Sequence, residues 1–195
     1  LGEFEQGQHL VRVYEDRVSS MAVLWGRRAF FATTADGFLY GSGERYRVLE
    51  YDPTGALRRI VRLDEEPEPV DAGAFGDWAD SVAARSDDPS AVRQRLRERY
   101  DGVRFPETKP TWTDLRVGAE GDLWLKRFSS SADGPERWTV FDSTGVHLGT
   151  MAMPAGFALV QVGMDFLLGV TTNELDVEAV EMYPLERGGD ADGAG

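Results

Sequence analysis

Apolar and polar residues alternate over short stretches of this chain, and turn-forming residues separate the stretches. A period of two residues is typical of a β-strand that buries one face. The expected strands cover residues 9–14, 18–24, 28–34, 38–41, 46–52, 57–63, 112–117, 123–128, 137–142, 146–153, 159–163, 166–171 and 177–185. This pattern predicts an all-β protein of short antiparallel strands.

One three-part pattern occurs twice: an acidic-Gly turn into an apolar strand, a second alternating strand, and an aromatic-Asp turn that closes on Thr-Gly. The copies occupy residues 36–60 and 120–149, and a weaker third copy occupies residues 164–183. Gly37 and Gly55 stand where tight turns require positive φ. A single such sheet cannot bury both of its faces, so the repetition predicts the blades of a propeller.

The strand count predicts an incomplete ring. Two blades have four strands, residues 9–24 form the outer part of an earlier blade, and the last blade lacks a fourth strand. The expected fold is a partial β-propeller of antiparallel four-stranded blades, about half of a six-bladed ring, over residues 1–187. Residues 188–195, which are rich in Gly and Asp, are expected to be a disordered tail.

A helical insert at about residues 71–102 separates the two complete blades. The proline-rich segment 65–69 cannot continue a sheet, and apolar residues then recur at helical spacing. Asp88 and Pro89 predict the start of the second helix. We expect the large apolar residues of both helices, Trp78 among them, to be buried against each other and against the neighbouring loops.

Charge and composition limit the partners. The formal net charge is -13 and cysteine is absent. Nucleic acid and anionic membrane surfaces would be repelled, and thiol chemistry is excluded. No apolar run approaches the ~20 residues that a membrane-spanning helix needs. The remaining partner classes are a small molecule, a glycan or a protein.

Several features follow one another along the chain. They are residues 26–28, the turn 36–40, the strand pair 47–60, the helical insert after Pro69 and the final strand 177–185. Together they resemble the C-terminal half of bacterial six-bladed β-propeller proteins, a group similar to NHL-repeat propellers. Members are often exported or lipid-anchored. The resemblance therefore implies an extracytoplasmic or periplasmic location, with a lipid anchor as one form of it.

The loops on one face of a propeller are the natural place for a site. The predicted ligand-binding residues, all on loops of this face, are Glu44, Arg45, Arg104, Lys109, Asn173 and Glu174. We expect these loops and the insert to form a binding module for a small molecule, a glycan or a protein. This hypothesis requires no metal or cofactor.

A metal-dependent hydrolase is the alternative hypothesis. Glu44, Asn173 and Glu174 could offer oxygen atoms to calcium, as the acidic and Asn residues of lactonase-type propellers do. Sequence motifs for zinc proteases, phosphate loops and serine hydrolases are absent. Both hypotheses remain open from the sequence.

A half ring leaves an apolar blade face open at each end. We therefore expect these faces to be covered by the remaining blades of a longer chain or by self-association. Without such cover the chain should be only marginally stable.

Overall fold

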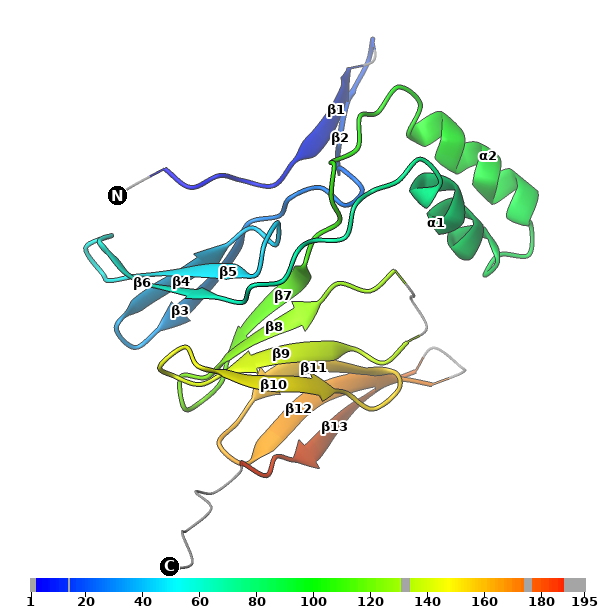
Figure 1. The fold of residues 1–195 in the computed structure, drawn as a ribbon. Helices are drawn as coiled ribbons and strands as arrows, with labels where there is room; N and C mark the ends of the chain where they lie inside the picture. The colour runs from blue at the N-terminus through cyan, green and yellow to red at the C-terminus, as the bar shows by residue number, and fades with distance from the viewer. Residues whose placement is uncertain (1–2, 14, 131–133, 174–176, 188–195) are drawn as a thin grey trace, which may run out of the picture.

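The computed structural model describes residues 3–13, 15–130, 134–173 and 177–187, which form four antiparallel sheets and two helices (Figure 1). The strands are β1 (His9–Val13), β2 (Val18–Ala22), β3 (Phe30–Thr34), β4 (Gly37–Gly41), β5 (Arg47–Tyr51), β6 (Leu57–Arg62), β7 (Trp112–Val117), β8 (Leu123–Arg127), β9 (Arg137–Phe141), β10 (His147–Ala152), β11 (Phe157–Val162), β12 (Phe166–Thr172) and β13 (Glu178–Pro184). The helices are α1 (Ala74–Ala83) and α2 (Pro89–Arg99). The predicted tail lies outside the described residues.

Each large sheet is built from consecutive strands. The orders are β3-β4-β5-β6, β7-β8-β9-β10 and β11-β12-β13, and every pairing is antiparallel. The first strands of the sheets are neighbours, because β7 contacts both β3 and β11. Sheets that follow one another around adjacent first strands are propeller blades (Figure 1). The chain is an all-β partial propeller of three blades, as the repeat predicts.

The repeated aromatic-Asp turn has one structure in both copies. Asp52 Oδ1 accepts hydrogen bonds from the Thr54 amide at 2.8 Å, the Thr54 hydroxyl at 2.6 Å and the Ala56 amide at 3.0 Å. Asp142 makes the same set of bonds in the second copy, beginning with Thr144. The threonine hydroxyl is the largest influence that lowers the pKa of each carboxyl group. The turn is therefore an Asx-type turn that joins the third and fourth strands.

Glycine is required in these turns. Gly55 and Gly145 have φ values of 87° and 88°, which L residues with a Cβ rarely adopt. Gly37 has φ 151°, and a Cβ there would lie 1.9 Å from the Tyr51 carbonyl oxygen. The predictions for Gly37 and Gly55 are confirmed.

The first two blades enclose one hydrophobic core. Its buried residues are Leu39, Tyr46, Val48, Val61, Trp112, Leu115, Leu123, Leu125 and Phe141. The Trp112 indole N–H donates to the Arg45 carbonyl at 2.9 Å, so the ring has its polar partner in the preceding blade. The Arg127 guanidinium lies 5.3 Å from the ring centre of Tyr46 and forms an ion pair with Glu65. Burial raises the pKa of Tyr46.

A second core lies between the middle and last blades. It contains Trp124, Trp138, Val140, Met153, Phe157, Leu159, Val162, Leu167 and Leu185. Alternation along β8 explains the division, because Leu123 and Leu125 belong to the first core and Trp124 to the second. The middle blade, β7–β10, is therefore covered on both faces.

The N-terminal hairpin differs from its predicted place. β1 and β2 form a separate two-stranded sheet beside α2, and the Arg12 guanidinium donates to the Asp101 carbonyl at 3.0 Å (Figure 1). These contacts hold the hairpin away from the first blade. Phe4 covers that blade instead, since its ring packs among four aromatic rings of β3, β4 and β5.

The helical insert is present, but Trp78 is only half-buried within it. Phe75, Trp78, Tyr100 and Phe105 form one aromatic cluster with ring centres 5.3–5.9 Å apart. The expected burial of Trp78 is wrong because α1 stands beside the blades with a hollow between them.

Replacing Trp112 with Ala should lower the free energy of unfolding by about 3–5 kcal/mol, because the lost indole leaves a cavity between two blades. Trp78→Ala should cost roughly half of that or less, because part of this ring is already in water. Urea denaturation would measure both, with Trp112→Phe as a control that keeps most of the ring. Equal losses for the two Ala variants would contradict the structure.

Candidate functional site

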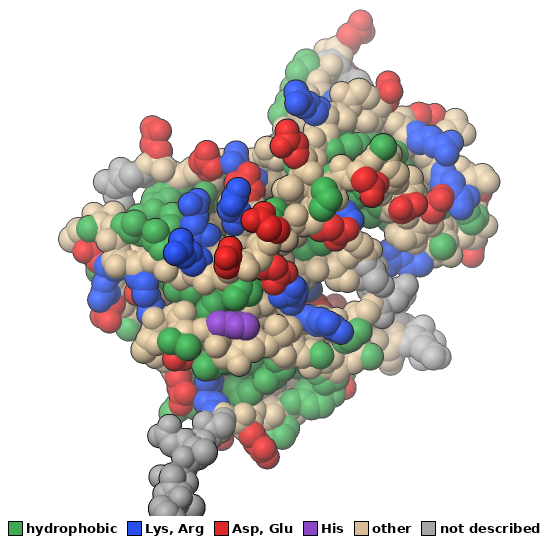
Figure 2. All heavy atoms as spheres, in the orientation of Figure 1, with side chains coloured by type: hydrophobic (Ala, Val, Ile, Leu, Met, Phe, Trp, Pro, Cys, Tyr) green, Lys and Arg blue, Asp and Glu red, His purple; other side chains and the backbone are tan. Residues whose placement is uncertain are grey.

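A hollow of about 700 Å³ separates the helical insert from the blades. We call it the insert cleft. Among the residues that line it are Trp25, Arg28, Asp77, Trp78, Tyr100 and Lys109. In Figure 2, acidic and basic side chains lie side by side on the surface where the insert joins the sheets. The insert and the neighbouring loops thus enclose a hollow.

One wall of the cleft is α1. At the start of this helix, the Asp71 side chain accepts hydrogen bonds from the amides of Gly73 and Ala74, both at 2.8 Å. Ala79 and Ala83 are buried in the insert. Trp78 lies on the cleft side and meets Tyr100 edge to face, with ring centres 5.6 Å apart. An aromatic surface therefore faces the hollow.

The stem of the insert is a short ladder between its two arms. The Val70 amide donates to the Glu107 carbonyl at 2.9 Å, and the Lys109 amide donates to the Glu68 carbonyl at 2.7 Å. The Lys109 ammonium also forms an ion pair with Glu68 and lies 3.3 Å from the Ser130 hydroxyl. These bonds fix the insert at its base and so hold α1 in its position beside the blades.

Two charged groups in the cleft have no partner within the described parts of the chain. They are the guanidinium of Arg28, from the connection between β2 and β3, and the carboxylate of Asp77, from α1. Both side chains are exposed. The cleft therefore offers a hydrogen-bond donor of positive charge and an acceptor of negative charge on different elements.

Trp25, in the connection between β2 and β3, also lines the insert cleft. It is the one non-glycine residue at positive φ, 57°, among the described residues. Its ring is buried and meets Phe105 edge to face at 5.5 Å. Strained backbone is concentrated at functional sites, where the surrounding contacts hold it. This strain adds to the case for a site here.

The structure brings three of the predicted ligand-binding residues together. Glu44, Arg45 and Lys109 line a second hollow of about 410 Å³ beneath the stem of the insert. Lys109 lines both hollows. Arg104 is exposed and lies in neither of them.

The two residues predicted on the last blade do not join this group. Asn173 closes the turn between β12 and β13, where its Oδ1 accepts the Val177 amide at 3.0 Å. It lines neither hollow. Glu174 lies outside the described residues. Of the predicted residues that the structure describes, three therefore lie together, and Arg104 and Asn173 lie apart from them.

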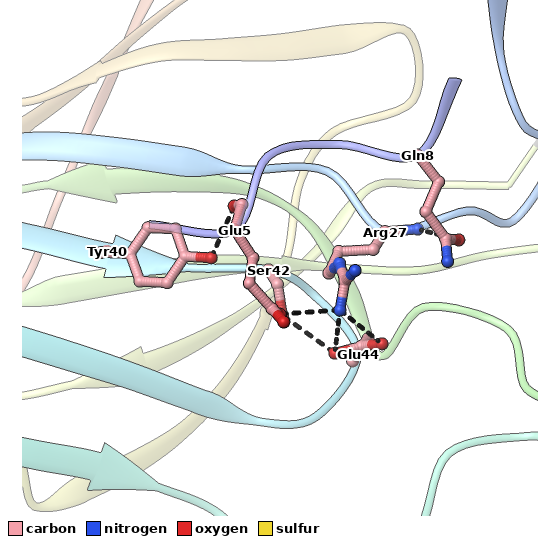
Figure 3. Close-up of polar contacts among 6 residues, drawn as sticks. All are labelled: Glu5, Gln8, Arg27, Tyr40, Ser42 and Glu44. Carbon is pink, nitrogen blue, oxygen red and sulfur yellow. Dashed lines mark hydrogen bonds and ion pairs between the residues drawn. The ribbon is translucent and has the colours of Figure 1, made fainter. Parts of the chain in front are cut away.

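Glu44 is engaged in a structural contact (Figure 3). Arg27 Nη1 lies 2.7 Å from Glu5 Oε2 and 3.4 Å from Glu44 Oε1, so it stands between the two carboxylates. The Tyr40 hydroxyl donates to the Glu5 carbonyl at 2.7 Å. This set of contacts ties the N-terminal segment to the loop between β4 and β5. The Glu44 carboxylate is partly neutralised by Arg27.

Metal-binding geometry is absent from the described part of the chain. No group of three or more His, Cys, Asp or Glu side chains there could hold a metal ion. His9 hydrogen-bonds the Gly7 carbonyl at 3.0 Å, and exposed His147 packs on Phe141. Neither histidine faces the insert cleft.

Neither protein families nor curated proteins provide a relative for this chain. No protein-family model matches the chain, and no curated protein shows significant similarity to its sequence. Within the described residues, neither helix has the length and apolar character that crossing a membrane demands. The site must therefore be interpreted from its own geometry.

The residues that define the cleft could be found only in part from the sequence. Arg28 and Asp77 belong to no catalytic or binding motif, and only the structure shows that both line the cleft without a partner among the described residues. Trp78 was predicted as a core residue from its helical spacing. The one sequence feature that could have predicted its position at the cleft is that it is a large aromatic residue in an insert next to the predicted loop face.

Asp88→Ala should destabilise α2 by about 1 kcal/mol, because Asp88 Oδ1 accepts the Ala91 amide at 3.0 Å as the N-cap of that helix. Amide hydrogen exchange in α2 should become faster while exchange in β7–β10 stays unchanged. Asp87→Ala is the matched control, since Asp87 is an exposed neighbour without this capping bond. Equal exchange in the two variants would show that the cap does not hold the helix.

Proposed function

We propose that this chain is a binding module and that its ligand occupies the insert cleft. The supporting observation is the hollow of about 700 Å³ between a fixed insert and the blades. Pockets for small molecules typically measure roughly 300–1,000 Å³ and combine aromatic walls with a few polar groups. The cleft meets both conditions, and its base is held by the paired arms of the insert.

The wall chemistry favours a ring-bearing polar ligand such as a saccharide. The partly exposed indole of Trp78, which Tyr100 meets edge to face, suits the apolar C–H face of a sugar ring. Asp77 can accept from hydroxyl groups and Arg28 can donate to them, and neither has to give up a partner on the described part of the chain. Charged hydrogen bonds at the edge of an aromatic platform would fix the orientation of such a ring.

The other partner classes have less support. A protein partner would need a broad surface, and the cleft is a concave hollow. The hydrolase hypothesis needs a set of metal ligands, and the described residues contribute no observation in its favour. The binding hypothesis accounts for the aromatic wall and for the two unpaired charges together.

A panel of mono- and oligosaccharides, amino acids and organic acids would test the proposal by thermal shift, with calorimetry on any compound that stabilises the chain. We expect a saccharide to bind, and Trp78→Ala or Asp77→Asn to weaken its binding at least about tenfold, which is the loss of one stacking or charged hydrogen-bond contact. Asp87→Asn is the control, because Asp87 is exposed and does not line the cleft. Binding that survives both cleft variants would place the ligand elsewhere.

A further inference from the structure

The two ends of the three-blade arc are apolar sheet faces. The first face, on β3–β6, consists of residues that point away from the first core: Phe31, Phe38, Tyr40, Leu49, Tyr51 and Ile60. The pairings Phe38–Tyr51, Tyr40–Leu49 and Leu49–Ile60 place these side chains next to one another. Phe4 fills the aromatic part of this face, yet Phe31 is still 56% exposed and Ile60 48% exposed.

The last face, on β11–β13, is its aliphatic counterpart. It consists of Leu168, Val170, Val180 and Met182, which point away from the second core, together with Val160 of β11, which is 51% exposed. Val180 is 73% exposed and Met182 is 67% exposed. Figure 2 shows hydrophobic side chains gathered at the lower end of the molecule, over this sheet. Among the described residues, no helix or strand of another sheet packs on this face.

The middle blade shows what such faces do when they meet. Trp112, Trp124 and Trp138 all lie in its sheet, and each is at most 1% exposed because a neighbouring blade covers it. The end blades contribute one face each to these cores. The other face of the last blade is exposed, and the other face of the first blade is covered in part by Phe4. A second blade against each open face would bury them by the same packing.

The charges on the two end faces are opposite at matching positions. Arg47 is the first residue of the third strand of its blade, and Glu178 is the first residue of the third strand of the last blade. Both belong to the outward faces, and Arg62 pairs with Arg47 across β5 and β6. The three side chains are exposed, and Arg47 and Arg62 lie side by side as like charges.

An ion pair of this kind already joins the first two blades. Glu65 follows β6 and pairs with Arg127, the last residue of β8 in the next blade. Glu65 and Arg62 stand at the same end of their blade as Arg47. A first face brought against a last face in the same orientation would therefore set Glu178 beside two arginines.

From these faces we infer that a second copy of this chain is the partner that covers them. The first face of each copy packs on the last face of the other, and two three-blade arcs close into a six-blade ring with twofold symmetry. Each contact joins two different surfaces, and the twofold axis closes the assembly after two copies. The N-terminal segment that carries Phe4 lies within the contact. The insert cleft stays outside it.

Light scattering after size exclusion tests the inference on the unaltered chain and on two variants. Ile60→Asp alters the first face and Val180→Asp alters the last face, and both residues are exposed enough for the fold to persist, which circular dichroism checks. The unaltered chain should have twice the mass of one chain at micromolar concentration. Each variant alone should be a monomer.

Mixing the two variants makes the test specific. The mixture should again give a dimer, because the unaltered last face of the Ile60→Asp chain can pack on the unaltered first face of the Val180→Asp chain. A monomeric unaltered chain would overturn the inference. So would a dimer lost in only one variant, which indicates like-face pairing, or open oligomers that grow with concentration.

Charge reversal provides a second readout on the same contact. Glu178→Arg should weaken the dimer at least several-fold, and adding Arg47→Glu and Arg62→Glu in the same chain should recover most of the loss. Added salt should weaken the unaltered dimer and leave the Glu178→Arg dimer less affected. Equal affinity in all three proteins would exclude the proposed register.

Discussion

Each blade is a sheet with two apolar faces, and the constraint on the fold is that a neighbouring blade must cover each face. The middle blade satisfies this constraint through three buried tryptophans and two cores that meet across β8. The contacts of β7 with β3 and β11 set the blades in order, and the cross-blade bonds of Trp112 and Arg127 fix their register. The end blades are the places where the constraint is met only in part.

Local signals allowed the sequence to predict most of the fold. The strands, the two Asp turns with Gly55 and Gly145, and the Asp88 cap depend on residues close together in the chain, so their patterns are complete within a short window. The errors concern long-range choices. Phe4 covers the first blade and the β1–β2 hairpin binds the insert, and no periodicity specifies which distant surface a segment will meet.

The candidate site, like the fold, was predicted only in part from the sequence. The sequence predicted a group of ligand-binding residues on the loops and the insert. Three of them, Glu44, Arg45 and Lys109, line one hollow near the stem. The sequence did not predict the insert cleft, because that hollow arises from α1 standing beside the blades with Trp78 half-buried. Burial of Trp78 in a core would have removed the aromatic wall. The incomplete burial of Trp78 thus leaves an aromatic surface that can contact a ligand.

Hydrogen exchange of backbone amides across the three blades measures how far the covering of each face stabilises its blade. Amides of the middle blade should exchange slowest, since both of its faces are covered, and amides of β5–β6 and β12–β13 should exchange faster in the monomeric face variants. In the dimer the end blades should approach the protection of the middle blade. Equal protection of all three blades in the monomer, or fastest exchange in β7–β10, would show that covered faces do not stabilise the blades.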